Sequence, residues 1–204
     1  MKAVNRLANV ISYLFHPLLM PTLGLLVIFN SGSFISNLPF EIKRMAYITV
    51  FIGTFILPIS IIPFFLFGRL VSSIKMSNRG ERVLPLAITA LLYYISFFIM
   101  TKSSIGPVVT IFMLATAVIV TLVLGISFFW KISAHLAGIG GITGLIISLT
   151  FRLKADLMSY LVIILIIAGL VSLARLLLDE HNPAQVYSGF LLGLINMIVI
   201  FYIF

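Results

Sequence analysis

LMSYLVIILIIAGLVSLA (residues 157–174) carries no charged side chain and is long enough to cross a lipid bilayer as one helix. Similar apolar runs recur along the chain without strand-like alternation, which favours helical spans over the strands of a barrel. Of the 204 residues, 62% are hydrophobic and 9% are charged. A soluble domain has about 45–50% apolar and about 25% charged residues. The sequence therefore predicts an all-α fold, a polytopic transmembrane helical bundle of six to seven spans.

Seven spans are expected, at about residues 7–29, 45–67, 83–100, 107–129, 133–150, 157–174 and 183–204. His16-Pro17 and Pro21 interrupt the first span, and Pro58 and Pro63 are expected to kink the second. Two glycine pairs have the spacing that lets membrane helices approach closely: Gly140 with Gly144, and Gly189 with Gly193. With no linker or repeat in the sequence, we expect one integral membrane domain over residues 1–204.

The chain has 13 Lys and Arg residues against 5 Asp and Glu residues, a formal net charge of +8. These cations form no basic tail or stripe, so nucleic-acid binding is not expected. They lie at the ends of apolar runs, where Lys and Arg anchor helices to lipid headgroups or bind an anionic ligand. The chain contains no cysteine, which excludes disulfides and thiolate metal sites. The lipid bilayer is the expected partner, and the oligomeric state is left open.

Three polar clusters interrupt the apolar sequence: KMSNRGER (75–82), KISAH (131–135) and RLLLDEHNPAQ (175–185). Two expected spans separate the first cluster from the second, and two more separate the second from the third. Because an even number of crossings returns the chain to the same side, all three clusters are predicted to share one face. The remaining cations are divided almost equally between the two faces, so the positive-inside rule does not decide the orientation.

The clusters hold the components of a phosphate site. Lys75, Arg82 and Arg175 supply cations, and a guanidinium binds phosphate through two parallel hydrogen bonds. Ser133 lies where the fifth span begins, and Asn182 has the position of an N-cap for the seventh. Helix N-termini present unpaired N–H groups and a positive dipole end, both favourable to phosphate.

His135 and His181 would flank an anion held by these groups. One imidazole can attack phosphorus while the other protonates the leaving oxygen. No Asp, Glu or His cluster has the spacing of metal ligands, so a mechanism without metal or other cofactor is expected. Arg79 and Lys131 lie within the clusters and are secondary candidates for contact with phosphate or headgroups.

The three clusters resemble the motifs of the type 2 phosphatidic-acid phosphatase superfamily, membrane lipid phosphatases with a site related to that of vanadium haloperoxidases. That family carries Lys-(six residues)-Arg-Pro, then Pro-Ser-Gly-His, then Ser-Arg-(five residues)-His-(three residues)-Asp. This chain has Lys75-MSNRGE-Arg82 followed by Val83, then Ile132-Ser133-Ala134-His135, then Ala174-Arg175-LLLDE-His181-NPA-Gln185. The resemblance covers about residues 70–195, the expected site-bearing core.

The resemblance implies hydrolysis of a lipid phosphate monoester or pyrophosphate at the membrane interface. In the site that the resemblance implies, the phosphate would be bound by Lys75, Arg82, Ser133 and Arg175. His181 would be the nucleophile and form a phosphohistidine. His135 would protonate the leaving lipid alcohol and then activate water. By analogy with bacterial relatives, the site would face the periplasm from the inner membrane.

Gln185 stands where the family has an Asp that orients the nucleophilic His and stabilises its positive form. A Gln carbonyl still accepts the ring N–H but brings no negative charge, so we expect a slower enzyme, or one that uses Asp179 or Glu180 instead. Gln185 also fits the N3 position of a capping box, which explains it without catalysis. Two alternatives stay open: a phosphotransferase on the same scaffold, and a non-catalytic protein that binds or transports lipid phosphates.

His16 lies inside the first span, directly before Pro17. An ionisable residue within a span is a functional candidate by default. The interpretation favoured by the sequence is a neutral His that bonds a carbonyl group freed near the prolines.

Overall fold

A computed structural model of the chain describes residues 2–71, the backbone of residue 79, and residues 80–204. Every regular element in that part of the chain is helical. The helices are α1 (Lys2–Leu14), α2 (Met20–Phe29), α3 (Phe40–Phe51), α4 (Leu57–Phe67), α5 (Arg79–Thr101), α6 (Pro107–Ser127), α7 (Ala134–Leu153), α8 (Met158–Leu177) and α9 (Pro183–Ile203). Short 3₁₀ turns, η1 (Pro17–Leu19) and η2 (Phe34–Asn37), and a π-helical turn, η3 (Ile52–Ile56), connect or extend them.

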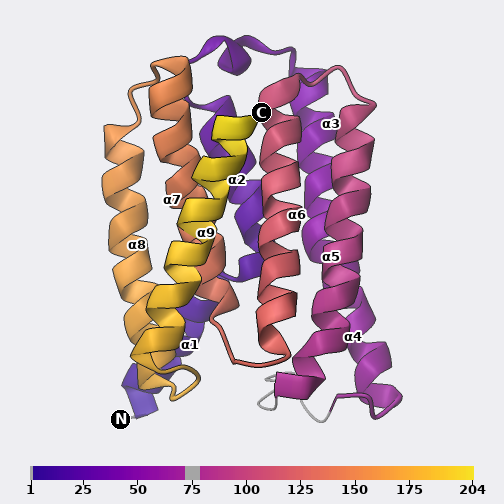
Figure 1. The fold of residues 1–204 in the computed structure, drawn as a ribbon, viewed down its shortest axis with the longest axis vertical. Helices are drawn as coiled ribbons and strands as arrows, with labels where there is room; N and C mark the ends of the chain where they lie inside the picture. The colour runs from indigo at the N-terminus through magenta and orange to yellow at the C-terminus, as the bar shows by residue number, and fades with distance from the viewer. Residues whose placement is uncertain (1, 72–78) are drawn as a thin grey trace.

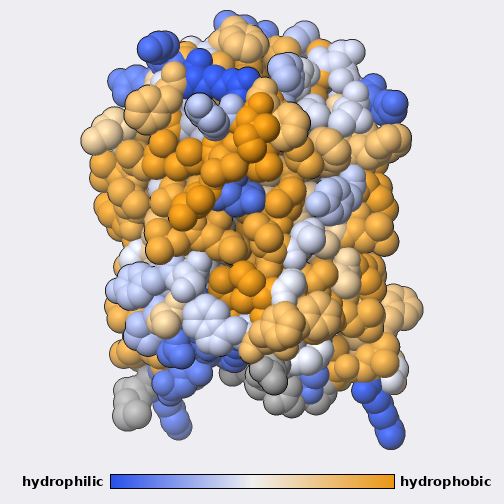
Figure 2. Space-filling model, in the orientation of Figure 1, coloured by the Kyte–Doolittle hydropathy of each residue, from blue (hydrophilic) through white to orange (hydrophobic). Residues whose placement is uncertain are grey.

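Seven segments of this described chain are long and apolar enough to cross a membrane, which confirms the predicted bundle. They cover Lys2–Phe29, Phe40–Phe67, Gly80–Thr101, Pro107–Ser127, Ala134–Leu153, Met158–Leu177 and Pro183–Ile203. The helices run roughly side by side, with their connections at the two ends of the bundle (Figure 1). On the face shown in Figure 2, apolar side chains form a broad band across the middle, and polar side chains gather at both ends. The protein is therefore an integral membrane protein.

The first span is broken near its middle, as its prolines predict. Helix α1 ends at Leu14, and His16 adopts an extended conformation (φ −62°, ψ 136°) before the short turn η1. A residue that precedes proline is disfavoured in the α region, which explains why the helix stops there. Helix α2 then begins at Met20 with Pro21 in its first turn. The break places His16 inside the bundle instead of on a regular helix.

The second span changes its helical pitch before Pro58. The chain is π-helical over Ile52–Ile56 and becomes α-helical again at Leu57, with Pro63 inside α4. Pro58 cannot donate a backbone hydrogen bond, and a local π turn is one way to accommodate such a residue. The hydroxyl of Thr54, within this turn, lies 3.3 Å from the carbonyl oxygen of Leu18. The irregular parts of the first two spans therefore contact each other.

Helices α7 and α9 pack closely through the two predicted glycine pairs. A Cβ atom built on Gly144 would lie 2.7 Å from the carbonyl oxygen of Leu194, and one on Gly189 would lie 2.5 Å from that of Ser133. Built Cβ atoms on Gly140 and Gly193 would also collide with backbone atoms of the opposite helix. The predicted small-residue packing is thus confirmed, and it brings the start of α7 against the start of α9.

The starts of α5, α7 and α9 and the end of α8 all lie at one end of the bundle, the lower end in Figure 1. We call this the site end. The chain begins at the site end and reaches the opposite end at its C-terminus (Figure 1). Among the described residues, the second and third polar clusters and Arg82 of the first therefore share one face, as the count of crossings predicts.

Candidate functional site

A cavity of about 250 Å³ extends from the site end into the bundle. Its charged and imidazole side chains are those of His16, Arg82, Lys131, His135, Arg175, Glu180 and His181, and Thr89, Tyr93 and Thr116 add hydroxyl groups. Its inner walls are apolar and include Pro17, Met20, Leu86, Phe112, Ile119 and Met197. A site of this kind can hold a charged headgroup at the membrane surface and an apolar chain in the interior.

Arg175, in the last turn of α8, lies beside α1. Its Nη1 atom is 3.4 Å from the hydroxyl oxygen of Ser12, and its Nη2 atom is 3.7 Å from Oε2 of Glu180. The Nε atom of Arg175 is buried and makes no hydrogen bond within the described part of the chain. Buried polar groups are nearly always paired, so this N–H is available to a bound anion.

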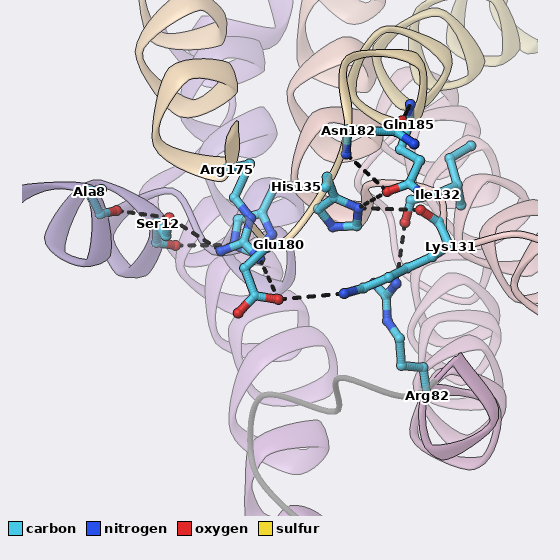
Figure 3. A network of polar contacts seen from close by, with 11 residues as sticks. Ala8, Ser12, Arg82, Lys131, Ile132, His135, Arg175, Glu180, Asn182 and Gln185 are labelled. Carbon is cyan, nitrogen blue, oxygen red and sulfur yellow. Dashed lines mark hydrogen bonds and ion pairs between the residues drawn. The ribbon is translucent and has the colours of Figure 1, made fainter. Parts of the chain in front are cut away.

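Glu180 connects two of the cations, as Figure 3 shows. Its carboxylate lies 3.6 Å from Nζ of Lys131 and also contacts Arg175. Arg82 reaches the same region from α5, where its Nη1 atom is 3.4 Å from the carbonyl oxygen of Ile132. Among the described residues that line the cavity, the charged groups sum to +2, from the cations of Arg82, Lys131 and Arg175 and the carboxylate of Glu180. That charge matches a phosphate dianion.

His181 is held by two oxygen acceptors on the same side of its ring. Its Nδ1 atom lies 3.0 Å from Oε1 of Gln185 and 3.2 Å from the carbonyl oxygen of Lys131. Because neither oxygen donates a proton, Nδ1 must carry the hydrogen, and Nε2 keeps its lone pair. In this tautomer, Nε2 is free to act as a nucleophile or as a base.

Gln185 combines the two roles that the sequence suggested. Its side-chain Oε1 atom accepts a hydrogen bond from the backbone N–H of Asn182 at 3.2 Å. The backbone N–H of Gln185 donates to Oδ1 of Asn182 at 2.9 Å, which completes the predicted capping box of α9. The N–H of Asn182 needs an oxygen acceptor, so the capping box fixes which atom of the Gln185 amide faces His181. The side chain therefore caps the helix and orients the imidazole together.

Burial lowers the pKa of His181 to about 4. The hydrogen bond with Gln185 raises the pKa, and the positive charges of Arg82, Arg175 and Lys131 lower it further. His181, 8% exposed, is therefore neutral at pH 7. A neutral ring is needed for attack on phosphorus.

This pKa predicts a loss of stability in acid. Below pH 6.5 the unfolded chain binds a proton at His181 that the folded protein does not, so stability falls as the pH drops from 6.5 to about 4. The expected loss is about 3 kcal/mol. It is measured as the pH dependence of the difference in unfolding free energy between the wild type and His181→Gln in detergent. A difference that stays constant from pH 7 to 4 would contradict a neutral, buried His181.

His135 is held in the opposite tautomer. Its Nε2 atom lies 3.2 Å from the backbone carbonyl oxygen of Ser12, so Nε2 carries the hydrogen of the neutral ring. Nδ1 then keeps its lone pair. Ser12 thus contacts both His135, through its carbonyl group, and Arg175, through its hydroxyl group. Figure 3 shows Ser12 on α1 beside Arg175.

The other predicted site residues are placed differently. Ser133 is the N-cap of α7 and is fully buried, but it packs toward Gly189 of α9 and does not line the cavity. Its hydroxyl oxygen has no hydrogen-bond partner within the described residues. Asp179 is exposed in the turn after α8, and Glu180 pairs with cations and not with His181. Lys75 and the side chain of Arg79 lie outside the described residues.

Two residues, His16 at the cavity and Ser12 behind its lining, were not predicted as site residues. His16 lines it, and its ring centroid lies 5.6 Å from that of His135. Ser12 had no sequence signal, because a serine that bonds the carbonyl four residues back, here Ala8, is common in helices. The signal for His16 was present in its position within a span, before a proline.

Comparisons with protein-family models, with curated proteins and with solved structures find no match for this chain. Within the described residues, no group of three or more His, Asp or Glu side chains is arranged to hold a metal ion.

Proposed function

We propose that this protein is a membrane phosphatase that hydrolyses a lipid phosphate monoester or pyrophosphate through a phosphohistidine at His181. The observation that carries the proposal is the composition of one cavity. Cationic and imidazole side chains from α5, α7, α8 and the connections before α7 and α9 line its polar end, and apolar side chains line its interior. Such a cavity suits a phosphate attached to a hydrocarbon chain.

In the proposed first step, the Nε2 lone pair of His181 attacks phosphorus, and the bond from phosphorus to the lipid oxygen breaks. Arg82, Lys131 and Arg175 stabilise the charge on the phosphoryl oxygens. As the substrate binds, Nδ1 of the neutral His135 takes up a proton from solvent, and the ring then gives this proton to the leaving oxygen. Its Nε2–H stays bonded to the carbonyl group of Ser12.

In the proposed second step, water attacks the phosphohistidine. Nδ1 of His135 takes a proton from the water, and the bond between nitrogen and phosphorus breaks, returning the lone pair to Nε2 of His181. The hydrogen bond from Nδ1 of His181 to Gln185 keeps the ring in place through both steps. The products are the lipid alcohol and inorganic phosphate. By analogy with the family that the motifs resemble, we infer a bacterial inner membrane and a site facing the periplasm.

The proposal is tested by measuring phosphate release from a panel of lipid phosphates by the detergent-purified protein. The panel contains phosphatidic acid, phosphatidylglycerol phosphate, a prenyl pyrophosphate and a lipid A phosphate. We expect release that persists in chelator and is inhibited by vanadate. Addition of an acceptor alcohol distinguishes a phosphotransferase, because transfer product would then exceed free phosphate. Binding of these lipids without release or transfer would favour the non-catalytic alternative.

Gln185→Glu is expected to raise turnover about tenfold. Glu has the same shape, keeps both acceptor contacts, and adds a negative charge that stabilises the positive imidazole formed during transfer. Gln185→Leu removes the acceptor and should lower turnover about 100-fold. The assay is kcat for phosphate release from the best lipid of the panel.

Asn182→Ala is the matched control for Gln185→Leu. It removes a capping contact of α9, at a cost of about 1 kcal/mol, but keeps the backbone N–H that holds the Gln185 oxygen toward His181. Turnover by Asn182→Ala should therefore stay close to that of the wild type. Equal losses in Asn182→Ala and Gln185→Leu would show that Gln185 only caps the helix.

A further inference from the structure

The ring of His16 is fixed by the break between α1 and η1. His16 is the N-cap of η1, and its Nδ1 atom accepts the backbone N–H of Leu18 at 3.3 Å. With Nδ1 acting as the acceptor, the neutral ring carries its hydrogen on Nε2. No hydrogen-bond partner of Nε2 is found among the described residues, and the ring lines the cavity. His16 therefore offers an N–H donor to whatever the cavity holds.

His16 lies where the polar part of the cavity meets the apolar part. On one side, its ring packs edge to face against His135, with centroids 5.6 Å apart and planes at 76°. On the other side, the residues that follow it, including Pro17 and Met20, form the apolar wall. In a lipid phosphate, the leaving oxygen is the atom that joins phosphorus to the hydrocarbon part. With phosphate at the cations and the chain in the apolar interior, that oxygen lies beside His16.

We propose that His16 is a catalytic residue that donates its Nε2–H hydrogen bond to the leaving oxygen. This role rests on the proposed phosphatase function. When the bond to phosphorus breaks, its electron pair goes to the leaving oxygen, and the proton that completes the alcohol comes from Nδ1 of His135. His16 keeps its proton and stabilises the charge that develops on the oxygen. A neutral imidazole is suited to this role as a hydrogen-bond donor.

The alternative role for His16 is structural, as the cap of η1, and two substitutions separate the roles. In His16→Asn, a side-chain oxygen can accept the N–H of Leu18 as Nδ1 does, but no donor reaches the position of Nε2. In His16→Gln, the longer side chain can place an amide N–H near the position of Nε2. A capping role therefore predicts an Asn variant like the wild type. A catalytic role predicts a defective Asn variant and partial recovery with Gln.

The test compares two substrates, a medium-chain alkyl phosphate and p-nitrophenyl phosphate, by kcat/KM in detergent. An alkoxide needs stabilisation to leave, whereas an activated phenolate leaves readily without it. We expect His16→Asn to lose about 100-fold with the alkyl phosphate and less than about threefold with the aryl phosphate. His16→Gln should recover part of the alkyl activity.

Equal losses with both substrates, or an unchanged alkyl rate in His16→Asn, would overturn the role of His16 while leaving the phosphatase proposal intact. Failure of the wild type to release phosphate from any of the substrates or lipids would instead overturn the phosphatase proposal, and the role of His16 with it.

Discussion

His181→Ala is expected to lower phosphate release by about 10⁴-fold or more, the scale seen when a hydrolase loses its nucleophile. The substitution removes the Nε2 lone pair but leaves Arg82, Lys131 and Arg175 in place, so the variant should still bind lipid phosphate. Its kcat should therefore fall far more than its affinity for the lipid. The measurement is kcat from phosphate release together with the dissociation constant for the same lipid.

Asp179→Asn is the matched control for His181→Ala. Asp179 lies two residues away, is exposed and has φ 52°, a conformation that Asn tolerates. We expect wild-type turnover from this variant. A His181→Ala protein that keeps more than about a tenth of wild-type turnover would contradict nucleophilic catalysis by His181. A large loss in Asp179→Asn would instead support Asp179 as an orienting carboxylate.

Gly193→Leu is expected to have the largest effect on stability, a loss of about 3 kcal/mol. A Cβ atom on Gly193 would collide with the backbone of Ala137, and it would lie 2.7 Å from the nitrogen of Gly141. Because backbone atoms cannot rotate away as side chains do, α7 and α9 must separate. That separation would also pull apart Ser133 and Gln185, whose backbone groups are hydrogen-bonded at 3.2 Å. Turnover should fall together with stability.

Gly169→Leu is the control for this substitution. Gly169 lies in the middle of α8, is exposed, and a Cβ atom there would meet nothing within 4 Å. Its replacement should leave both the thermal unfolding temperature in detergent and the turnover nearly unchanged. Equal destabilisation by the two substitutions would mean that the α7–α9 contact is not specially sensitive to side-chain volume.

The sequence predicted those features that depend on local pattern. Uncharged runs of about 20 residues specify spans because an unpaired backbone group is costly in lipid. The start of α9 was also predictable, because the N-cap, N1 and N3 positions carry suitable residue types, namely Asn182, Pro183 and Gln185. The shared face of the clusters followed from counting spans.

The features that depend on packing between distant segments were not predictable. The contacts of Ser12 with His135 and Arg175 exist because α1 packs against α8 and approaches the start of α7. Ser133 packs against α9 because the glycines of α9 let the two helices approach closely. The residues of the KISAH segment alone do not predict this contact. The expected bond from His16 to a freed carbonyl group is wrong, since Nδ1 accepts the backbone N–H of Leu18 instead. The contact of its ring with His135, 119 positions away in the sequence, has no local signal.

The proposed covalent phosphohistidine at His181 can be trapped and detected during turnover. The wild-type protein is mixed with the best lipid phosphate of the panel, quenched in alkali during turnover, digested, and analysed by mass spectrometry. We expect one added phosphoryl group on His181, lost on acid treatment and absent from His181→Ala. A phosphoryl group on any other residue, or none during sustained turnover, would contradict the proposed intermediate.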